Sequence, residues 1–153
     1  VILFFVSFAD NYFFVTPQKN AKSMLYGNLE TAYYLAQNYK DRNIIVSRKL
    51  SEPHIYIAFA NAWDPIDYQK YTNSWDYKDK GLVWVDQMSK YILGNYTFGD
   101  LYYPSYKNSD TVMVGRPDEF PESVVPSWVF HNPDGTDAIY VVDPIESQYA
   151  KIF

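Results

Sequence analysis

The chain opens with an almost unbroken apolar run. Residues 1–9 are apolar except for Ser7, and Asp10 and Asn11 end the run. The aromatic residues 12–14 follow in the manner of the belt found at membrane interfaces. As a helix, residues 1–9 would span about 13 Å, less than half of a hydrocarbon core of about 30 Å. The pattern therefore supports two hypotheses equally: the end of a longer transmembrane helix, or a buried first strand of the domain.

A helical pattern comes next. Apolar residues recur at spacings of three and four, which is the stripe of an amphipathic helix. The stripe consists of Ala21, Leu25, Leu29, Ala32, Ala36 and Tyr39. It predicts a helix over residues 21–39. The β-branched run 44–46 then predicts a strand, because short continuous apolar runs are typical of strands buried on both faces in a parallel sheet.

A second helix is expected to begin at Pro53. Proline suits the first helical position because its missing N–H would have no partner there. Ser51 or Glu52 would cap this helix, which would run to about Trp63. Residues 64–71 predict a further helical turn, since the residue before a proline disfavours helical backbone and separates the two segments.

Strand patterns dominate the second half of the chain. Residues 96–103 have strand composition, with Gly99 as the expected bulge, and residues 111–114 predict another strand. Two alternating runs, 128–131 and 138–142, flank a turn-rich link and predict a terminal β-hairpin. The pattern as a whole predicts a single α/β domain, with a mixed, mostly parallel sheet flanked by helices and a C-terminal β-hairpin.

Composition narrows the functional classes. A length of 153 residues fits one compact domain, and 48% apolar against 20% charged residues excludes a disordered tail. The net charge of -5 would repel a phosphate backbone, so nucleic acid is not an expected partner. Cysteine is absent, which excludes thiol nucleophiles, Cys-ligated metals and disulfides.

Catalytic and nucleotide-binding motifs are missing from the sequence. Neither G-x-G-x-x-G nor G-x-S-x-G occurs. Gly94 and Gly99 have P-loop spacing, but the required Lys and Ser/Thr do not follow them. The two histidines, His54 and His131, lie far apart without a motif, so a structural role is expected for His54 and a surface position for His131. No catalytic residue is assigned.

Three pairs of carboxylates occur at i,i+3 spacing. On a helix this spacing places both groups on one face, as an acid/base pair or a metal ion would need. The pairs are Asp64 with Asp67, Asp76 with Asp79, and Asp134 with Asp137. Each has a simpler interpretation as a cap, a solvated charge run or a turn. The sequence therefore predicts no metal site and no cofactor.

An aromatic-rich stretch carries the only binding hypothesis. Flat rings beside polar groups hold a sugar by stacking on its apolar faces while bonding its hydroxyls. The candidate substrate-binding residues are Tyr56, Trp63, Tyr68 and Trp75, with Tyr71 and Tyr77 nearby. The alternative is an aromatic core with tyrosine hydroxyls at its rim.

The order of these features resembles a known family. Five phrases carry the likeness: YFFVTPQKNAKSMLYGNLETAYYLAQNY, NIIVS, PHIYIAFANAWDPIDYQKY, TVMVGRPDEFP and VFHNPDGTDAIYVVD. They resemble the C-terminal extracytoplasmic domain of GT-C class membrane glycosyltransferases, the group of protein mannosyltransferase-like and aminoarabinose-transferase-like enzymes. In the family a phrase like D-P-x-x-Y-Q, here at 64–69, follows an aromatic helix, and a P-D-G-T-like turn, here at 133–136, precedes the last strand; the likeness rests on the two in combination.

The resemblance implies a parent enzyme that transfers a sugar from a polyprenyl-phosphate carrier to an acceptor. The acidic catalytic residue of that class lies in a loop that has no counterpart here, so the domain would be a non-catalytic accessory that shapes acceptor access or stabilises the enzyme. Residues 1–15 would then end the last transmembrane helix, and residues 16–153 would form the domain on the extracytoplasmic (periplasmic or extracellular) face of the membrane. The implied partners are the membrane-embedded part of the same protein and a glycan or lipid-linked sugar.

Two other classes stay open. A freestanding carbohydrate-binding module would use the aromatic stretch for oligosaccharide binding. A soluble α/β enzyme of unknown type would show a pocket containing a buried carboxylate with a shifted pKa.

Overall fold

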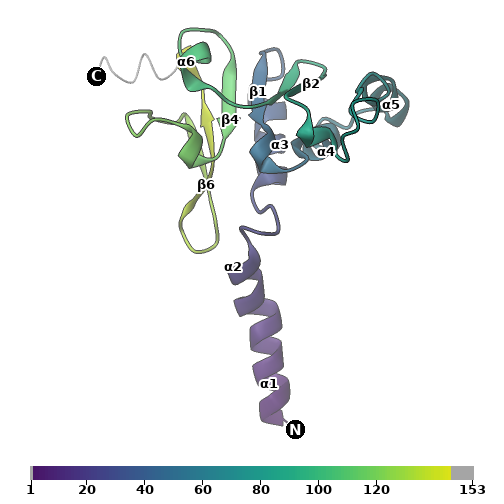
Figure 1. The fold of residues 1–153 in the computed structure, drawn as a ribbon. Coiled ribbons are helices and arrows are strands. Elements are labelled where there is room, and N and C mark those ends of the chain that lie inside the picture. Colours follow the sequence, from purple (N-terminus) through teal and green to yellow (C-terminus); the bar gives the residue numbers. More distant parts are fainter. Residues whose placement is uncertain (1, 146–153) are drawn as a thin grey trace.

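An open six-stranded sheet with the order β2-β3-β1-β4-β6-β5 forms the centre of the computed structural model, which describes residues 2–145 (Figure 1). Its strands are β1 (Ile44–Ser47), β2 (Lys90–Leu93), β3 (Tyr96–Gly99), β4 (Val112–Gly115), β5 (Trp128–His131) and β6 (Asp137–Val142). Strand β1 pairs in parallel with β3 and β4. The other three pairings, β2–β3, β4–β6 and β5–β6, are antiparallel.

The predicted α/β class, the single mixed sheet and the C-terminal hairpin are confirmed. The balance of strand directions differs from the prediction, because the sheet is mostly antiparallel. The physical reason is that β2–β3 and β5–β6 are joined by short turns, and such connections allow only antiparallel pairing. Parallel pairing is confined to the centre, where β1 reaches its neighbours through long connections.

The α-helices are α1 (Ile2–Asp10), α2 (Thr16–Asn20), α3 (Asn28–Asn38), α4 (Pro53–Ala60), α5 (Pro65–Thr72) and α6 (Tyr103–Tyr106). A π-helical stretch, η1 (Asn11–Val15), joins α1 to α2. Three 3-10 turns are η2 (Arg48–Leu50), η3 (Val85–Gln87) and η4 (Pro117–Glu119).

Elements α1, η1 and α2 form one N-terminal helical segment, residues 2–20, which projects away from the sheet (Figure 1). None of its residues is buried, and the first buried side chain along the chain is Ala21, 3% exposed. The alternative of a buried first strand is therefore wrong. Within residues 2–145, no helix combines the length and apolarity required to cross a bilayer.

The helix predicted over residues 21–39 begins later than expected. Residues 21–27 form turns, and Leu25 and Gly27 both have left-handed backbone, with φ of 57° and 90°. Left-handed residues cannot continue a right-handed helix. Helix α3 therefore starts at Asn28, whose side-chain amide donates to the Leu50 carbonyl oxygen over 2.7 Å.

Helix α4 begins at Pro53 as predicted, and α5 begins at Pro65, within one residue of the start of the predicted segment 64–71. Asp64 caps α5, accepting a hydrogen bond from the Ile66 N–H over 2.7 Å. The cap predicted for α4 is absent, because Glu52 has left-handed backbone (φ 47°) and makes no side-chain capping bond. Helix α4 ends at Ala60, three residues before the predicted end at Trp63.

The core lies on both faces of the central strands. Ile44, Val46, Val112 and Val114 face α3 and α4, whereas Ile45 and Met113 face the opposite side, which α6 covers. These six side chains are at most 2% exposed, as expected for strands buried on both faces.

Glycine at position 99 has a different role from the predicted bulge. Gly99 pairs with Lys90 in regular register. A Cβ placed there would lie 2.8 Å from the Ser89 carbonyl oxygen, so the backbone approach itself requires glycine. Strand β2 was not predicted from the sequence, although Tyr91 and Leu93 alternate with exposed neighbours.

Candidate functional site

The centre of the sheet contains a topological switch point between β1 and β4. After β1 the chain continues to the β3 side of the sheet, whereas after β4 it continues to the β6 side. In open α/β sheets, ligands bind in the crevice outside the carboxyl ends of the strands at such a point. This edge is therefore the first place to look for a site.

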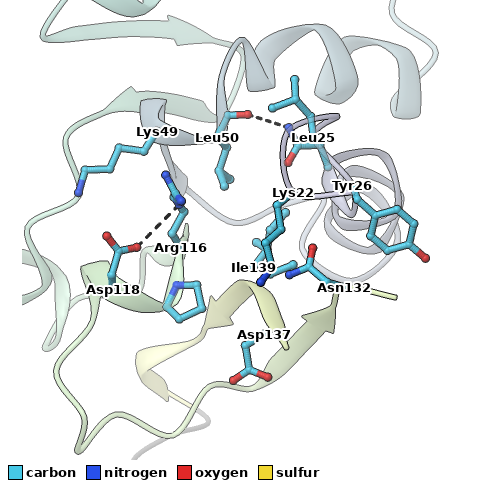
Figure 2. A pocket seen from close by; sticks show the side chains of 13 residues that line it. Lys22, Leu25, Tyr26, Lys49, Leu50, Arg116, Asp118, Asn132, Asp137 and Ile139 are labelled. Carbon is cyan, nitrogen blue, oxygen red and sulfur yellow. Dashed lines mark hydrogen bonds and ion pairs between the residues drawn. The ribbon is translucent and has the colours of Figure 1, made fainter. Parts of the chain in front are cut away.

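A pocket of about 460 Å³ lies at this edge, and we call it the switch-point pocket (Figure 2). Lys49 follows β1, Arg116 follows β4, and Asp137 begins β6. Figure 2 shows Arg116 on one side of the pocket and Lys22 with Asn132 on the other. The volume falls within the range of about 300–1,000 Å³ usual for small-molecule sites.

Each cation of the switch-point pocket faces a carboxylate. Lys22 Nζ lies 3.3 Å from Asp134 Oδ2, and Arg116 Nε lies 3.8 Å from Asp118 Oδ1. Lys49 Nζ lies 3.8 Å from the Glu119 carboxylate. The pocket thus offers donors and acceptors in balance, which suits an uncharged or zwitterionic polar ligand better than a strong anion.

Glu119 anchors the wall of this pocket. Its side chain is 3% exposed, accepts a 2.7 Å hydrogen bond from Ser47 Oγ, and accepts the Arg116 backbone N–H over 2.9 Å. It therefore ties the end of β1 to the turn after β4. This group of residues was not predicted from the sequence. The signal that could have indicated it was a basic residue within two positions of the end of each buried strand, Lys49 after β1 and Arg116 after β4.

A second cavity, of about 500 Å³, lies between α4, α5 and the segment that precedes β2. We call it the aromatic pocket. Its principal lining residues are Glu52, His54, Tyr68, Trp75, Tyr77 and Trp84. It therefore joins aromatic rings to polar groups, as the sequence suggested.

The structure brings two of the four candidate binding residues into this pocket. Tyr68 and Trp75 line it. Tyr56 instead packs against the main core. Trp63 contacts Tyr71 at a ring separation of 5.2 Å and covers Gly94, where a Cβ would lie 2.8 Å from the indole.

Trp75 is mainly structural within the pocket. It is 9% exposed, and its indole N–H donates to the Ile92 carbonyl oxygen over 3.0 Å. Its ring lies 4.9 Å from that of Tyr91 and 5.1 Å from that of His54. The interpretation of an aromatic core with a polar rim thus describes Trp75 well.

A hydrogen-bonded chain lies beneath the aromatic pocket. Tyr91 donates from its hydroxyl to Asp86 Oδ1 over 2.5 Å, and the same hydroxyl lies 3.2 Å from His54 Nδ1. Burial lowers the pKa of His54 to about 4, against a weaker opposing effect of Asp86. Burial and then the bond to Asp86 raise the pKa of Tyr91 well above its ordinary value. His54 is therefore neutral and Tyr91 protonated at neutral pH.

The turn between the two pockets has unusual backbone. Ser51 and Glu52 have φ of 55° and 47°, a region that side-chain-bearing residues rarely occupy. The Glu52 N–H donates to the Asp86 carboxylate, which holds this turn in place. Leu50 lines the switch-point pocket and Glu52 the aromatic pocket, so this strained turn separates them.

The carboxylate pairs have the simpler roles. Asp64 caps α5, and Asp67 pairs with Lys70 at 2.6 Å. Asp76 pairs with Lys80 at 2.9 Å. In the turn of the hairpin, Asp134 accepts from Thr136, while Asp137 accepts from the Tyr140 hydroxyl and lies 3.0 Å from His131 Nδ1.

No group of three or more His, Asp or Glu side chains between residues 2 and 145 is arranged to hold a metal ion. No family model, curated protein or solved structure matches the chain. The α/β class of the domain thus follows from its own sheet and helices.

Proposed function

We propose that the chain is a membrane-attached accessory domain of a GT-C class glycosyltransferase that transfers a sugar from a polyprenyl-phosphate carrier to an acceptor. The domain lies on the extracytoplasmic face, contacts the membrane-embedded part of the same protein, and shapes acceptor access or stabilises the enzyme. The observation that carries the proposal is the exposure of the apolar N-terminal helical segment.

The exposure of this segment is extreme for apolar side chains. Ile2, Leu3 and Phe4 are 79%, 84% and 85% exposed, and Phe13 and Phe14 are 64% and 65% exposed. Burying one such side chain stabilises it by about 1.5–3 kcal/mol relative to water. Contiguous exposed apolar surface of this kind marks a membrane or protein contact. An apolar environment around residues 2–9, with the aromatic residues 12–14 at its boundary, would bury this surface.

The segment joins the domain at the edge that carries the switch-point pocket. Helix α3 runs antiparallel to β1, since Asn28 at its start bonds to Leu50 beyond the end of β1. Lys22, two residues after α2, lines the pocket. The polar helix α2 adds a spacing of about 8 Å between Val15 and the domain. A membrane surrounding this segment would therefore face the edge of the sheet that carries the switch-point pocket.

The sugar-transfer part of the proposal rests on the family resemblance, and the site chemistry is compatible with a non-catalytic domain. The rival enzyme would show a buried carboxylate with a shifted pKa in a pocket. In the aromatic pocket, the buried group with a lowered pKa is His54, which is neutral and hydrogen-bonded to Tyr91. That geometry fits a binding or structural role.

Vesicle flotation tests the attachment. The full chain should float with phosphatidylglycerol/phosphatidylethanolamine vesicles, and a triple variant, Phe4→Ser, Phe5→Ser and Phe8→Ser, should remain in the dense fraction. The matched control replaces Phe59 by Ser, since Phe59 is 66% exposed on α4, away from the segment. Flotation of the triple variant, or loss of flotation in the control alone, would contradict the proposal.

An activity assay tests the accessory role. The chain reconstituted in vesicles is incubated with a polyprenyl-phosphate-linked sugar and an acceptor, and transfer is measured by radiolabel. We expect no turnover by the chain alone. Turnover that a His54→Gln substitution abolishes would overturn the accessory role and favour the enzyme.

A further inference from the structure

We propose that the aromatic pocket binds a neutral saccharide, with one sugar ring stacked on Trp84 and its hydroxyls bonded by Glu52, His54 and Tyr68. This inference goes beyond membrane attachment, since it concerns a different surface and requires no lipid. It rests on the available ring, the arrangement of donors and acceptors, and the charge of the pocket.

Trp84 is the ring that a ligand can reach. It is 60% exposed, whereas Trp75, which also lines the pocket, is 9% exposed. Its backbone is fixed, because Gln87 Oε1 accepts the N–H of Val83 over 2.6 Å and that of Trp84 over 3.2 Å. The exposed indole therefore presents a flat apolar surface to a ligand. Because its backbone is already ordered, binding there costs no further backbone entropy, which favours binding.

The polar groups form a set suited to hydroxyls. Burial first and the Glu52 carboxylate second raise the pKa of Tyr68, so its hydroxyl is a donor at neutral pH. Glu52 and Tyr68 both line the aromatic pocket, so the carboxylate and the phenol face the same cavity. Glu52 is acceptor-only, and Tyr68 can both donate and accept. Adjacent hydroxyls of a sugar ring need this combination.

The hydrogen-bonded chain assigns the tautomer of His54. The Tyr91 hydroxyl donates its hydrogen bond to Asp86, so the Tyr91 oxygen accepts a hydrogen bond from His54 Nδ1–H. In a neutral imidazole the other nitrogen, Nε2, is then an acceptor. His54 lines the pocket, and it therefore provides a second acceptor beside Glu52 without adding charge.

The charge of the pocket selects against other small ligands. Its carboxylates, Glu52 and Asp79, outnumber its single cation, Lys78, so a phosphate would be repelled. Aromatic rings with carboxylates also suit a quaternary ammonium ion. Lys78 argues against that ligand, because its ammonium already lies 5.7 Å from the centre of the Tyr77 ring. A neutral ligand with many hydroxyls and apolar ring faces fits this lining best.

Titration of the full chain tests the inference. The chain is kept in a polyoxyethylene detergent, which carries no sugar, and is titrated with α-mannobiose, maltotriose and N,N′-diacetylchitobiose while tryptophan fluorescence and saturation-transfer NMR are recorded. At least one probe should bind with a Kd below about 20 mM. Trp84→Ala and Glu52→Gln should each weaken that binding about tenfold or more, which corresponds to about 1.4 kcal/mol.

Trp128→Ala is the matched control. Trp128 is 48% exposed on β5 and stacks on Tyr34 at 5.1 Å, outside the aromatic pocket. Its replacement should leave the affinity within about twofold. Circular dichroism and thermal midpoints show whether each variant folds. The proposal is overturned if no probe binds, if Trp84→Ala binds as well as the parent, or if choline binds in the pocket and the saccharides do not. None of these outcomes depends on vesicle flotation, so the two proposals can fail separately.

Discussion

The N-terminal helical segment and the central strands are similarly apolar in sequence but have opposite environments. Side chains in β1 and β4 are at most 2% exposed, whereas Leu3 and Phe4 are 84% and 85% exposed. Short β-branched runs fit between two layers of helices, but the longer Phe-rich run forms a helix that contacts neither layer. Apolar composition thus identifies the side chains that need to be shielded from water. Whether the domain itself buries them depends on the fold.

The largest expected effect comes from replacing a phenylalanine by alanine in the central sheet, compared with the same replacement in the N-terminal helical segment. Phe98, on β3, is fully buried, and its ring lies 4.8 Å from that of Tyr91. Phe98→Ala should lower the free energy of unfolding by about 4 kcal/mol, because it leaves a cavity. Phe4→Ala should change it by less than about 0.5 kcal/mol. Urea unfolding measures both, and equal losses would refute the distinction between the regions.

A buried ion pair gives the next largest effect. Arg42 Nη1 lies 3.2 Å from Asp143 Oδ2, and the Asp143 side chain is 3% exposed. Arg42→Met leaves that carboxylate buried without its guanidinium and should cost about 3 kcal/mol. Lys70→Met is the control, since Lys70 and Asp67 are both exposed and such pairs contribute about 0.5 kcal/mol. Similar shifts of the urea midpoint for both variants would contradict the buried position of Asp143.

Acid should destabilise the domain through His54. Its pKa is lowered to about 4 in the folded chain, against 6.5 as its ordinary value, so the unfolded chain binds more protons between these values. The contribution of neutral His54 to the free energy of unfolding is therefore fully present above pH 6.5. It decreases as the pH falls, by about 2 kcal/mol at pH 5. His54→Gln should remove this part of the pH dependence. Parallel curves for the two proteins from pH 7 to 4 would show that His54 is not desolvated.

The smallest expected effect lies at the joint between the two regions. Gly27 has φ of 90°, and a Cβ there would meet Ile139 Cδ1 at an ordinary 3.5 Å. Gly27→Ala should therefore cost about 1 kcal/mol through backbone strain, without a clash. Thermal unfolding followed by circular dichroism measures it. No change would mean that the turn before α3 relaxes freely.

Much of the fold could be predicted because particular residues in the sequence favour particular local structures. Pro53 indicated the start of one helix, the Asp64-Pro65 pair separated it from the next helical segment, and the β-branched run 44–46 indicated the central strand. The turns at residues 21–27 could not be predicted, since Leu25 adopts a left-handed backbone that its side chain does not favour. The antiparallel pairing of β2 with β3 also escaped prediction, because strand β2 itself was not predicted.

The candidate sites were only partly predictable. The aromatic stretch led to Tyr68 and Trp75, which line one pocket, but ring density alone could not distinguish them from Tyr56 in the core. Trp84 was missed because it lies outside the aromatic stretch in the sequence, and the fold brings it to the same pocket as Tyr68 and Trp75. The switch-point pocket required the strand order, since Lys49 and Arg116 are far apart in sequence.

The parallel centre of the sheet also bears on how the chain folds. Ile44 pairs with Val112 in the β1–β4 ladder, so the whole segment between them must be accommodated before that ladder closes. Hairpins β2–β3 and β5–β6 need only short loops and can close within microseconds. Contacts between residues distant in the chain slow folding, so formation of the β1–β4 ladder should limit the refolding rate.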